Sequence, residues 1–320
     1  MNRESRIFIA GHRGLVGSAI TAYLQAQGFS RLLLRTRAEL DLSDTQAVNA
    51  FFAAEQPEYV FLAAAKVGGI LANDTFPADF IRDNLVLQTN IIEGSRRAGV
   101  QRLLFLGSSC IYPRFAPQPI REEYLLTGPL EATNRSYALA KIAGIEMCWS
   151  YNRQYGTQYL AAMPCNLYGP DDNFNLATSH VLPALMRKVV QAKAAGRDSI
   201  EVWGTGMPRR ELLYSEDLAE AAVFLMQLPD AEFAHLLGAE HPPLINIGTG
   251  EDITIRELAE LIARELDFHG TLLFDTTKPD GTPRKLMDVS RIRSLGWQPK
   301  TSLAEGIRRT YAAAAEQLAQ

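Results

Sequence analysis

The sequence predicts an α/β protein with a doubly wound, parallel sheet, and three observations support this fold class. Short apolar runs alternate with helical patterns through residues 1–164. The runs are apolar throughout, which is typical of strands that helices cover on both faces of a parallel sheet. A glycine-rich turn separates the first run from the first helix, at the point where such folds place a ligand.

The first half of the chain contains the expected strands and the helices that connect them. The strands are expected at residues 6–10, 32–34, 59–64, 103–106 and 159–163. The helices are expected at residues 14–27, 44–55, 79–98 and 137–155. Strands and helices that alternate in this order predict parallel βαβ units.

The pattern changes after Pro164, where the strands become shorter. Helices are expected at 181–194, 218–228, 255–265 and 302–318, and short strands at 200–203 and 245–247. We expect a larger first domain at residues 1–164, to which segments within about 211–248 return. A smaller α/β substrate-binding domain is expected from residues 165–210 and 249–320. Because no flexible linker separates the two, the site is expected in the cleft between them.

Composition and charge exclude several classes of protein. The 320 residues are 47% hydrophobic, which is enough for a sizeable core. A formal net charge of −4 gives no field that attracts nucleic acid or an anionic membrane. The longest apolar run, residues 221–226, is far shorter than a membrane span, and the first residues lack a signal-peptide pattern. The three cysteines have no metal-ligand spacing and suit a reducing compartment, so we expect a cytoplasmic protein without a metal.

Residues 11–17, with the sequence Gly-His-Arg-Gly-Leu-Val-Gly, form the turn between the first strand and the first helix. Glycines there allow a tight turn and a close approach of the backbone to a pyrophosphate, which the helix N-terminus attracts. The spacing is G-x-x-G-x-x-G rather than the common G-x-G-x-x-G, so a purely structural turn is the alternative. The strand before the turn and the helix after it favour a dinucleotide site in a Rossmann domain.

Two arginines favour NADP over NAD. Sites for NAD usually present an acidic residue about 20 residues after the loop. Here the second strand ends in Arg-Thr-Arg at residues 35–37, and Arg13 lies within the loop itself. Guanidinium groups match a 2′-phosphate in charge and geometry, so Arg13 and Arg37 predict NADP(H) as the cofactor.

A Tyr-x-x-x-Lys pair and a serine predict reductase chemistry. Tyr137 and Lys141 are four residues apart in an expected helix, so they share one face about 6 Å apart at Cβ. The ammonium group is expected to lower the pKa of the tyrosine. Ser108 follows the fourth strand, where parallel sheets place their chemistry. The pair alone is common on ordinary helices, and its combination with the glycine loop makes it informative.

Six segments, spread over nearly the whole chain, resemble a known family: residues 8–14, 63–70, 106–113, 166–170, 179–181 and 278–285. With them the chain resembles the extended short-chain dehydrogenase/reductases, and within these the GDP-L-fucose synthase family. The segments at 108–110 (Ser-Ser-Cys) and 279–282 (Pro-Asp-Gly-Thr) are more specific than the glycine loop. The resemblance implies that the substrate GDP-4-keto-6-deoxy-D-mannose is epimerised at C3 and C5. NADPH then reduces C4 to give GDP-L-fucose, in a homodimer.

The resemblance also implies roles for individual residues. Ser108, Tyr137 and Lys141 match the reductase triad, and Cys110 and His180 match the base and the acid of epimerisation. The implied cofactor-binding residues are Gly11, His12, Arg13, Gly14, Leu15, Val16, Gly17, Arg37, Asp41, Leu42, Leu106, Gly107, Ser108, Ser109, Tyr137, Lys141, Pro164, Cys165, Asn166, Leu167 and His180. The implied substrate-binding residues are Lys188, Trp203, Arg210 and Asp280.

The chemistry of epimerisation agrees with these roles. A proton next to a ketone becomes removable if hydrogen bonds from Ser108 and Tyr137 stabilise the enolate. Inversion needs proton removal on one face of the carbon and delivery on the other, hence two groups. A cation near Cys110 is expected to favour its thiolate. Taken alone, Cys110 would be a small buried residue and His180 a capping or surface residue.

Two departures from the family pattern and two alternative functions stay open. Lys188 stands where arginine is expected, which loosens a bidentate phosphate contact, and Asp171 replaces a histidine. The first alternative is another NAD(P)-dependent nucleotide-sugar enzyme, a C4 epimerase or a 4,6-dehydratase. Dehydratases of that group carry Thr-Asp-Glu in place of residues 108–110, and a C4 epimerase would leave Cys110 idle. The second is a dinucleotide sensor without catalysis, which often lacks the tyrosine or the lysine.

Overall fold

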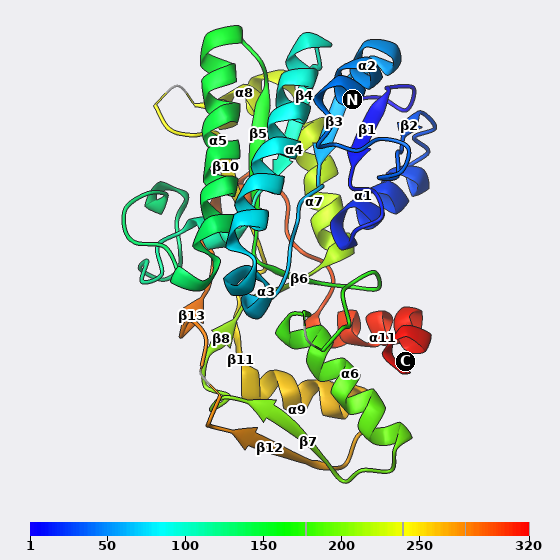
Figure 1. The fold of residues 1–320 in the computed structure, drawn as a ribbon, viewed down its shortest axis with the longest axis vertical. Helices are drawn as coiled ribbons and strands as arrows, with labels where there is room; N and C mark the ends of the chain where they lie inside the picture. Colours follow the sequence, from blue (N-terminus) through cyan, green and yellow to red (C-terminus); the bar gives the residue numbers. More distant parts are fainter. Residues whose placement is uncertain (177, 239, 279, 320) are drawn as a thin grey trace.

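A six-stranded parallel sheet with the order β10-β5-β4-β3-β1-β2 forms the centre of the larger lobe (Figure 1). The computed structural model describes residues 1–319 except 177, 239 and 279, and all their side chains except those of 70 and 71. The strands are β1 (Ile7–Ala10), β2 (Leu32–Leu33), β3 (Tyr59–Leu62), β4 (Arg102–Leu106), β5 (Tyr159–Pro164) and β10 (Leu244–Ile247). Apart from β2, every residue of these strands is buried, as the apolar runs predicted.

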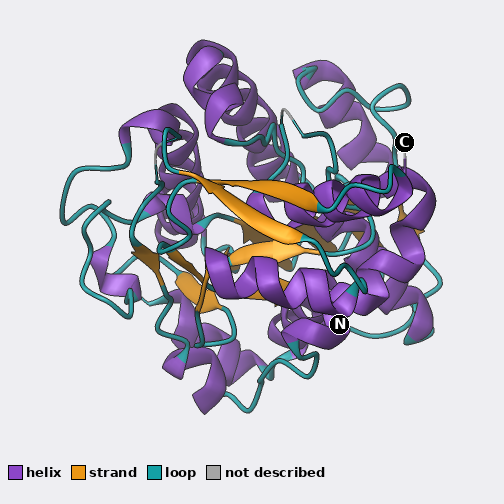
Figure 2. Cartoon of the chain, turned by 90° about the horizontal axis from the view of Figure 1, so that it is seen from below, coloured by secondary structure: helices purple, strands orange, loops and turns teal. Residues whose placement is uncertain are grey.

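Helices lie on both faces of this sheet, which confirms the doubly wound α/β class (Figure 2). The helices of this lobe are α1 (Leu15–Ala26), α2 (Thr45–Glu55), α3 (Ile70–Thr75), α4 (Pro77–Arg97), α5 (Arg135–Tyr155), α7 (Ser215–Gln227), α8 (Asp230–Leu237) and α10 (Ser290–Ser294). Helix α1 packs against α7, while α4 packs against both α2 and α5. Local signals fix several ends: the Asp44 carboxylate caps α2 by accepting two backbone N–H bonds, and Gly156 ends α5 in the left-handed conformation.

The smaller lobe has its own hydrophobic core. Helices α6 (Val181–Ala194), α9 (Ile255–Glu265) and α11 (Leu303–Ala319) pack on one another, and β7 (Ser199–Trp203) pairs in parallel with β12 (Thr271–Asp275). Two small sheets connect this lobe to the first. One pairs β6 (Asn166–Tyr168) with β9 (Leu212–Tyr214), and the other has the order β11-β8-β13 from Ile253–Thr254, Arg209–Arg210 and Arg284–Lys285.

The two cores follow the expected division of the chain with one difference. Strand β10 joins the large sheet, and the helix α7 packs beside α1. However, Met287, Val289 and Trp297 belong to the first core, although residues 249–320 were assigned to the second domain. Their side chains lie beside the large sheet because α10 packs against β10. The domain limits themselves stay a prediction.

Within the described residues, no helix is both long and apolar enough to cross a membrane. The same part of the chain contains no cluster of three or more His, Cys, Asp or Glu side chains suited to a metal ion.

Candidate active site

The expected site residues gather at the carboxyl edge of the large sheet. The glycine loop follows β1, Gly107 and Ser108 follow β4, and Cys165 follows β5. Strand β1 lies between β2 and β3, so the order of the strands reverses beside the glycine loop. Open parallel sheets bind their ligands at such a switch point.

The glycine loop has the shape that a pyrophosphate needs. Gly11 has φ of +88°, and a Cβ there would lie 2.7 Å from the backbone nitrogen of Ala64. A Cβ at Gly17 would collide with the carbonyl oxygen of Gly11. Gly14 precedes α1 as its N-cap and has no side-chain acceptor, and its own N–H donates to the Gly11 carbonyl oxygen at 3.1 Å. The first turn of α1 carries no acidic residue, so the N–H groups of that turn can bind an anion. The buried Nδ1 of His12 also has no hydrogen-bond partner in the part of the chain that the structure describes, and these features together fit a dinucleotide.

The arginines near the expected 2′-phosphate site differ in their surroundings. Arg35 forms an ion pair with Glu55 at 2.5 Å and lies over the Phe51 ring, so it is part of the protein's own packing. Arg37 instead has a side chain that is 89% exposed, with the Asp41 carboxylate 4.0 Å from its Nε. Arg13 is also exposed. The two arginines that the sequence singled out are therefore available to an external phosphate, and their contact with NADP stays a prediction.

The tyrosine and lysine of the reductase pair lie together at the start of α5. The Lys141 Nζ donates to the Leu106 carbonyl oxygen at 2.7 Å and lies 5.8 Å from the centre of the Tyr137 ring. Gln88 of α4 is buried and donates to the Ala140 carbonyl oxygen at 2.7 Å, which fixes α5 next to the lysine. Ser108 lies just beyond Leu106, at the same end of β4.

Burial dominates the protonation of this pair. It lowers the pKa of Lys141 to about 8 and raises the pKa of Tyr137 above its ordinary value. The prediction that the ammonium group lowers the tyrosine pKa is therefore wrong for the protein without ligands. The reason is that both groups are desolvated, while the lysine is hydrogen-bonded to the end of β4 and not to the phenol.

Cys110 lines a small cavity. Ser108 caps the short helical turn Ser109–Ile111 by accepting a hydrogen bond from the Cys110 backbone N–H at 3.4 Å. The cavity has a volume of about 30 Å³ and is lined by Cys110, Tyr112, Pro113, Arg114, Gln118, Ile120, Glu131, Asn134, Thr282, Arg284 and Lys285. The Oδ1 of Asn134 is buried there without a hydrogen-bond partner in the described residues. The walls therefore offer several polar groups to a ligand.

Lys285 is the charged residue that the sequence did not single out. Burial raises the pKa of the Cys110 thiol, and the Lys285 ammonium is the strongest influence in the opposite direction. Desolvation in the cleft and the charge of Lys285 lower the pKa of His180. Lys285 thus lies within electrostatic reach of both proposed proton carriers. Its segment, 278–285, was noted in the sequence, but no local pattern indicated where this strand would pair.

The four expected substrate residues form two neighbouring groups. Lys188 Nζ lies 5.3 Å from the centre of the Trp203 ring and donates to the Glu201 carbonyl oxygen at 2.8 Å, and the indole is 60% exposed. Arg210 Nη1 donates to two carbonyl oxygens, and the Asp280 carboxylate is close enough to affect its pKa. Backbone and hydroxyl groups of Thr205 hold the two Asp280 oxygens at 2.9 and 2.7 Å.

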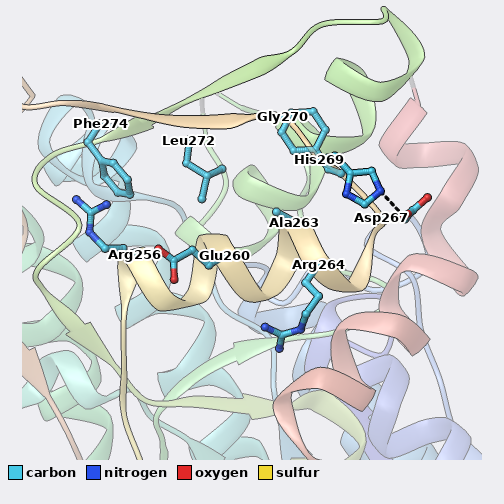
Figure 3. Close-up of a pocket in the computed structure, with 10 residues that line it drawn as sticks. Arg256, Glu260, Ala263, Arg264, Asp267, His269, Gly270, Leu272 and Phe274 are labelled. Atoms are coloured by element: carbon cyan, nitrogen blue, oxygen red, sulfur yellow. Dashed lines mark ion pairs between the residues drawn. The ribbon is translucent and has the colours of Figure 1, made fainter.

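A larger groove of about 490 Å³ lies between α9 and β12, away from these residues (Figure 3). Arg256 lies over the Phe274 ring at 3.8 Å, and His269 contacts Asp267 at 3.0 Å. None of the expected site residues lines this groove. Its Arg256 donates to the Thr205 carbonyl oxygen at 3.4 Å, so the groove wall supports the loop that holds Asp280.

Comparisons with known proteins place the chain in a family. Residues 7–248 match the model of the NAD dependent epimerase/dehydratase family. The chain is 57% identical over 310 residues to GDP-L-fucose synthase 1 of Arabidopsis thaliana, covering 97% of this chain and 93% of that protein. It is 53% identical over 312 residues to the GDP-L-fucose synthase of Escherichia coli (strain K12), covering 96% of each.

A solved structure agrees. The GDP-mannoheptose C4 reductase from Campylobacter jejuni with NADP bound superposes with a TM-score of 0.89 at 43% identity, covering 98% of this chain and 99% of that chain. Fold, site and sequence point the same way: the chain belongs to the NAD dependent epimerase/dehydratase family and, within it, to the GDP-L-fucose synthases.

Proposed function

We propose that this chain converts GDP-4-keto-6-deoxy-D-mannose to GDP-L-fucose, with NADPH as the reductant. The observation that carries the proposal is the combination of two chemistries in one cleft. Tyr137 and Lys141 can protonate a reduced ketone, while Cys110 lies two residues from Ser108 in a cavity that the same cleft contains. Relatives more than half identical over nearly their whole length carry the same activity in their names.

The glycine loop and the N-terminus of α1 would hold the NADPH pyrophosphate, with Arg13 and Arg37 at its 2′-phosphate. When bound, NADPH supplies the hydride that reduces C4. Lys141, fixed by the Leu106 carbonyl oxygen, is placed to bind the nicotinamide ribose through its remaining N–H groups. Strand β5 pairs with β4 on the side away from β1 and the glycine loop, and Cys165 to Leu167 follow the end of β5.

Reduction needs a proton donor to the oxygen that forms at C4. In this proposal Tyr137 gives its phenolic proton to that oxygen, and Ser108 donates a hydrogen bond to it. Because burial raises the Tyr137 pKa, the phenol carries its proton before the reaction but is a weaker acid than a free phenol. Lys141 then stabilises the phenolate that remains.

Epimerisation needs a base and an acid at C3 and C5. In this proposal the Cys110 thiolate takes the proton next to the ketone, the electron pair moves into the enolate, and His180 returns a proton to the opposite face. The pKa directions show that the ligand-free protein holds a thiol and a neutral imidazole. The thiolate must therefore form before the first proton is removed, and His180 must gain a proton before it can deliver one, so epimerisation depends on what favours these two forms.

The nucleotide end of the substrate is assigned to the second lobe. We infer that the exposed indole of Trp203 stacks on the base, and that Arg210 binds the diphosphate beside Asp280. Lys188, which already lies over Trp203, provides a point charge in place of a bidentate guanidinium. We further propose a homodimer that acts in the cytoplasm, where the three free cysteines stay reduced.

The direct test incubates the protein with NADPH and GDP-4-keto-6-deoxy-D-mannose and identifies the sugar by NMR. The expected product is GDP-L-fucose, inverted at C3 and C5 and reduced at C4. Reduction without inversion would leave a C4 reductase. Unchanged substrate, despite bound NADPH, would contradict the proposal.

A further inference from the structure

Strand pairing brings Lys285 into the cavity of Cys110. Strand β13 runs parallel to β8, with Arg284 beside Arg209 and Lys285 beside Arg210. Because neighbouring residues of a strand point to opposite faces, the two pairs separate. Arg284 and Arg209 meet at Asp252 on one face, whereas Lys285 and Arg210 lie on the other, and both Arg284 and Lys285 line the cavity of Cys110.

The Asp252 carboxylate holds this strand register through Arg209 and Arg284. The Asp252 side chain is only 5% exposed and accepts hydrogen bonds from Arg209 Nε at 2.7 Å and Arg284 Nε at 2.5 Å. The Arg209 backbone N–H also donates to the Pro283 carbonyl oxygen at 2.8 Å. A shift of β13 by one residue would remove Arg284 from Asp252 and turn Lys285 out of the cleft. Asp252 therefore fixes which cation faces Cys110.

The charges around the cysteine favour an effect of Lys285. Among the described residues, the Lys285 Nζ forms no ion pair, although Glu131 lies close enough to affect its pKa. The other charged groups that act on it or on the sulfur are Arg210 on β8 and Lys141 on α5, and His180 shares the field of Lys285. Two more cations line the cavity, and each has a carboxylate partner: Arg114 pairs with Glu131, and Arg284 pairs with Asp252. Burial lowers the Lys285 pKa, and a charged sulfur at Cys110 raises it, so the two charges stabilise each other.

We propose that Lys285 is the cation that keeps the Cys110 sulfur available as a thiolate for proton removal, with Asp252 as the positioning residue that sets it there. The inference rests on the proposed function, in which Cys110 removes the α-protons, and adds the group that makes this possible. Lys285 itself keeps its proton throughout: the sulfur gains the proton from carbon, and the electron pair passes into the enolate.

Alkylation of Cys110 by iodoacetamide tests the effect without substrate. The thiolate attacks carbon and iodide leaves, so the rate follows the thiolate fraction. The rate is measured from pH 6.5 to 9.5 by mass spectrometry of the Cys110 peptide. In Lys285→Met we expect alkylation about tenfold slower at pH 7.5, which corresponds to a half-point about one pH unit higher. Lys285→Arg keeps the charge and should restore most of the rate.

Two further variants guard against a folding defect. Glu131→Gln removes a negative charge near Lys285 and should speed alkylation, the opposite direction from Lys285→Met. Asp252→Asn should slow it, less than Lys285→Met does. Lys300→Met is the matched control, because the Lys300 ammonium pairs with Glu220 on the surface. NADPH binding, followed by quenching of tryptophan fluorescence, reports whether each variant is folded.

An unchanged profile in folded Lys285→Met, or Glu131→Gln acting in the same direction as Lys285→Met, would overturn the proposal. An unchanged profile in Asp252→Asn alone would remove the positioning role. These outcomes are separate from failure of the proposed function, which would appear as wild-type protein that does not exchange the C3 and C5 hydrogens of the substrate, whatever the alkylation rates.

Discussion

Burial shifts the pKa of each ionisable side chain to which the proposed function gives a catalytic role. It raises the pKa of Cys110 and Tyr137, and it lowers the pKa of Lys141 to about 8 and that of His180 below its ordinary value. The Tyr137 phenol thus carries the proton that the proposed reduction requires. The Cys110 thiol must first lose its own proton before the sulfur can accept one from carbon, so the two half-reactions should respond differently to pH.

This difference gives a prediction for the pH dependence of proton removal at C3 and C5. Below the raised pKa of Cys110 the thiolate fraction increases about tenfold per pH unit. We therefore expect kcat/KM for exchange of the C3 and C5 hydrogens with D₂O to rise steadily from pH 6.5 to 8.5. This exchange needs only proton removal, so loss of the His180 proton, which delivery to the opposite face requires, does not oppose the rise. A flat profile would show that the thiolate is not the base.

Cofactor choice is also decided by single residues. Replacing Arg13 and Arg37 by Ala should raise KM for NADPH by at least about 100-fold and leave KM for NADH nearly unchanged, because each charge-assisted phosphate contact is worth roughly 1.5–3 kcal/mol. Steady-state kinetics with both nucleotides measure this. Arg35→Ala is the control, since Arg35 is paired with Glu55. Equal use of NADH and NADPH by the wild type would contradict the assignment.

At the scale of elements, long amphipathic helices and the strands at 200–203 and 245–247 could be predicted, whereas the two-residue strands that join the lobes could not. Helices α6 and α9 have the expected bounds, and α9 begins with a Thr254–Glu257 capping box. Strands β8, β11 and β13 have two residues each, too few for a periodic pattern. Their partners lie more than 40 residues away in sequence, so the pairing follows from tertiary packing. Lys285 was missed for this reason, whereas Tyr137 and Lys141 share a helix with a readable spacing.

A buried carboxylate joins these short strands to the larger lobe. Glu211, between β8 and β9, is fully buried and accepts backbone N–H bonds from Gly250 at 2.8 Å and Met287 at 2.7 Å. Burial raises its pKa to about 7. The folded protein therefore holds this proton more tightly than the unfolded chain, whose pKa is near the ordinary 4.5, and stability falls as pH rises between the two values.

Glu211→Gln should weaken this dependence on pH. The amide cannot ionise, and it keeps one acceptor for the two N–H groups. We expect the free energy of unfolding, measured with urea, to fall less between pH 5 and 7 in the variant than in the wild type. Glu232→Gln, at an exposed position of α8, is the control. An identical slope in Glu211→Gln and wild type would contradict the prediction.

At the scale of the whole molecule, two cores meet around one cleft. In the proposed function the larger lobe supplies the residues for NADPH, the triad and Cys110, and the smaller lobe supplies His180, Lys188 and Trp203. The alternation of apolar runs made the first lobe predictable, because each strand is buried on both faces. The small sheets that join the lobes depend on contacts between distant segments, and so the residues that line the Cys110 cavity could not be predicted from the sequence.

The central claim is that one cleft performs two separable reactions, and exchange of hydrogens with D₂O tests it most directly. With substrate and NADPH, Cys110→Ser should lose deuterium incorporation at C3 and C5 but still reduce C4, which gives a GDP-6-deoxyhexose other than fucose. A serine hydroxyl is far less acidic than a thiol, whereas Tyr137 and Lys141 are untouched. Tyr137→Phe should show the reverse, with incorporation retained and reduction slower by several orders of magnitude. If Cys110→Ser makes GDP-L-fucose at the wild-type rate, with deuterium at C3 and C5, Cys110 is a packing residue and the account is wrong.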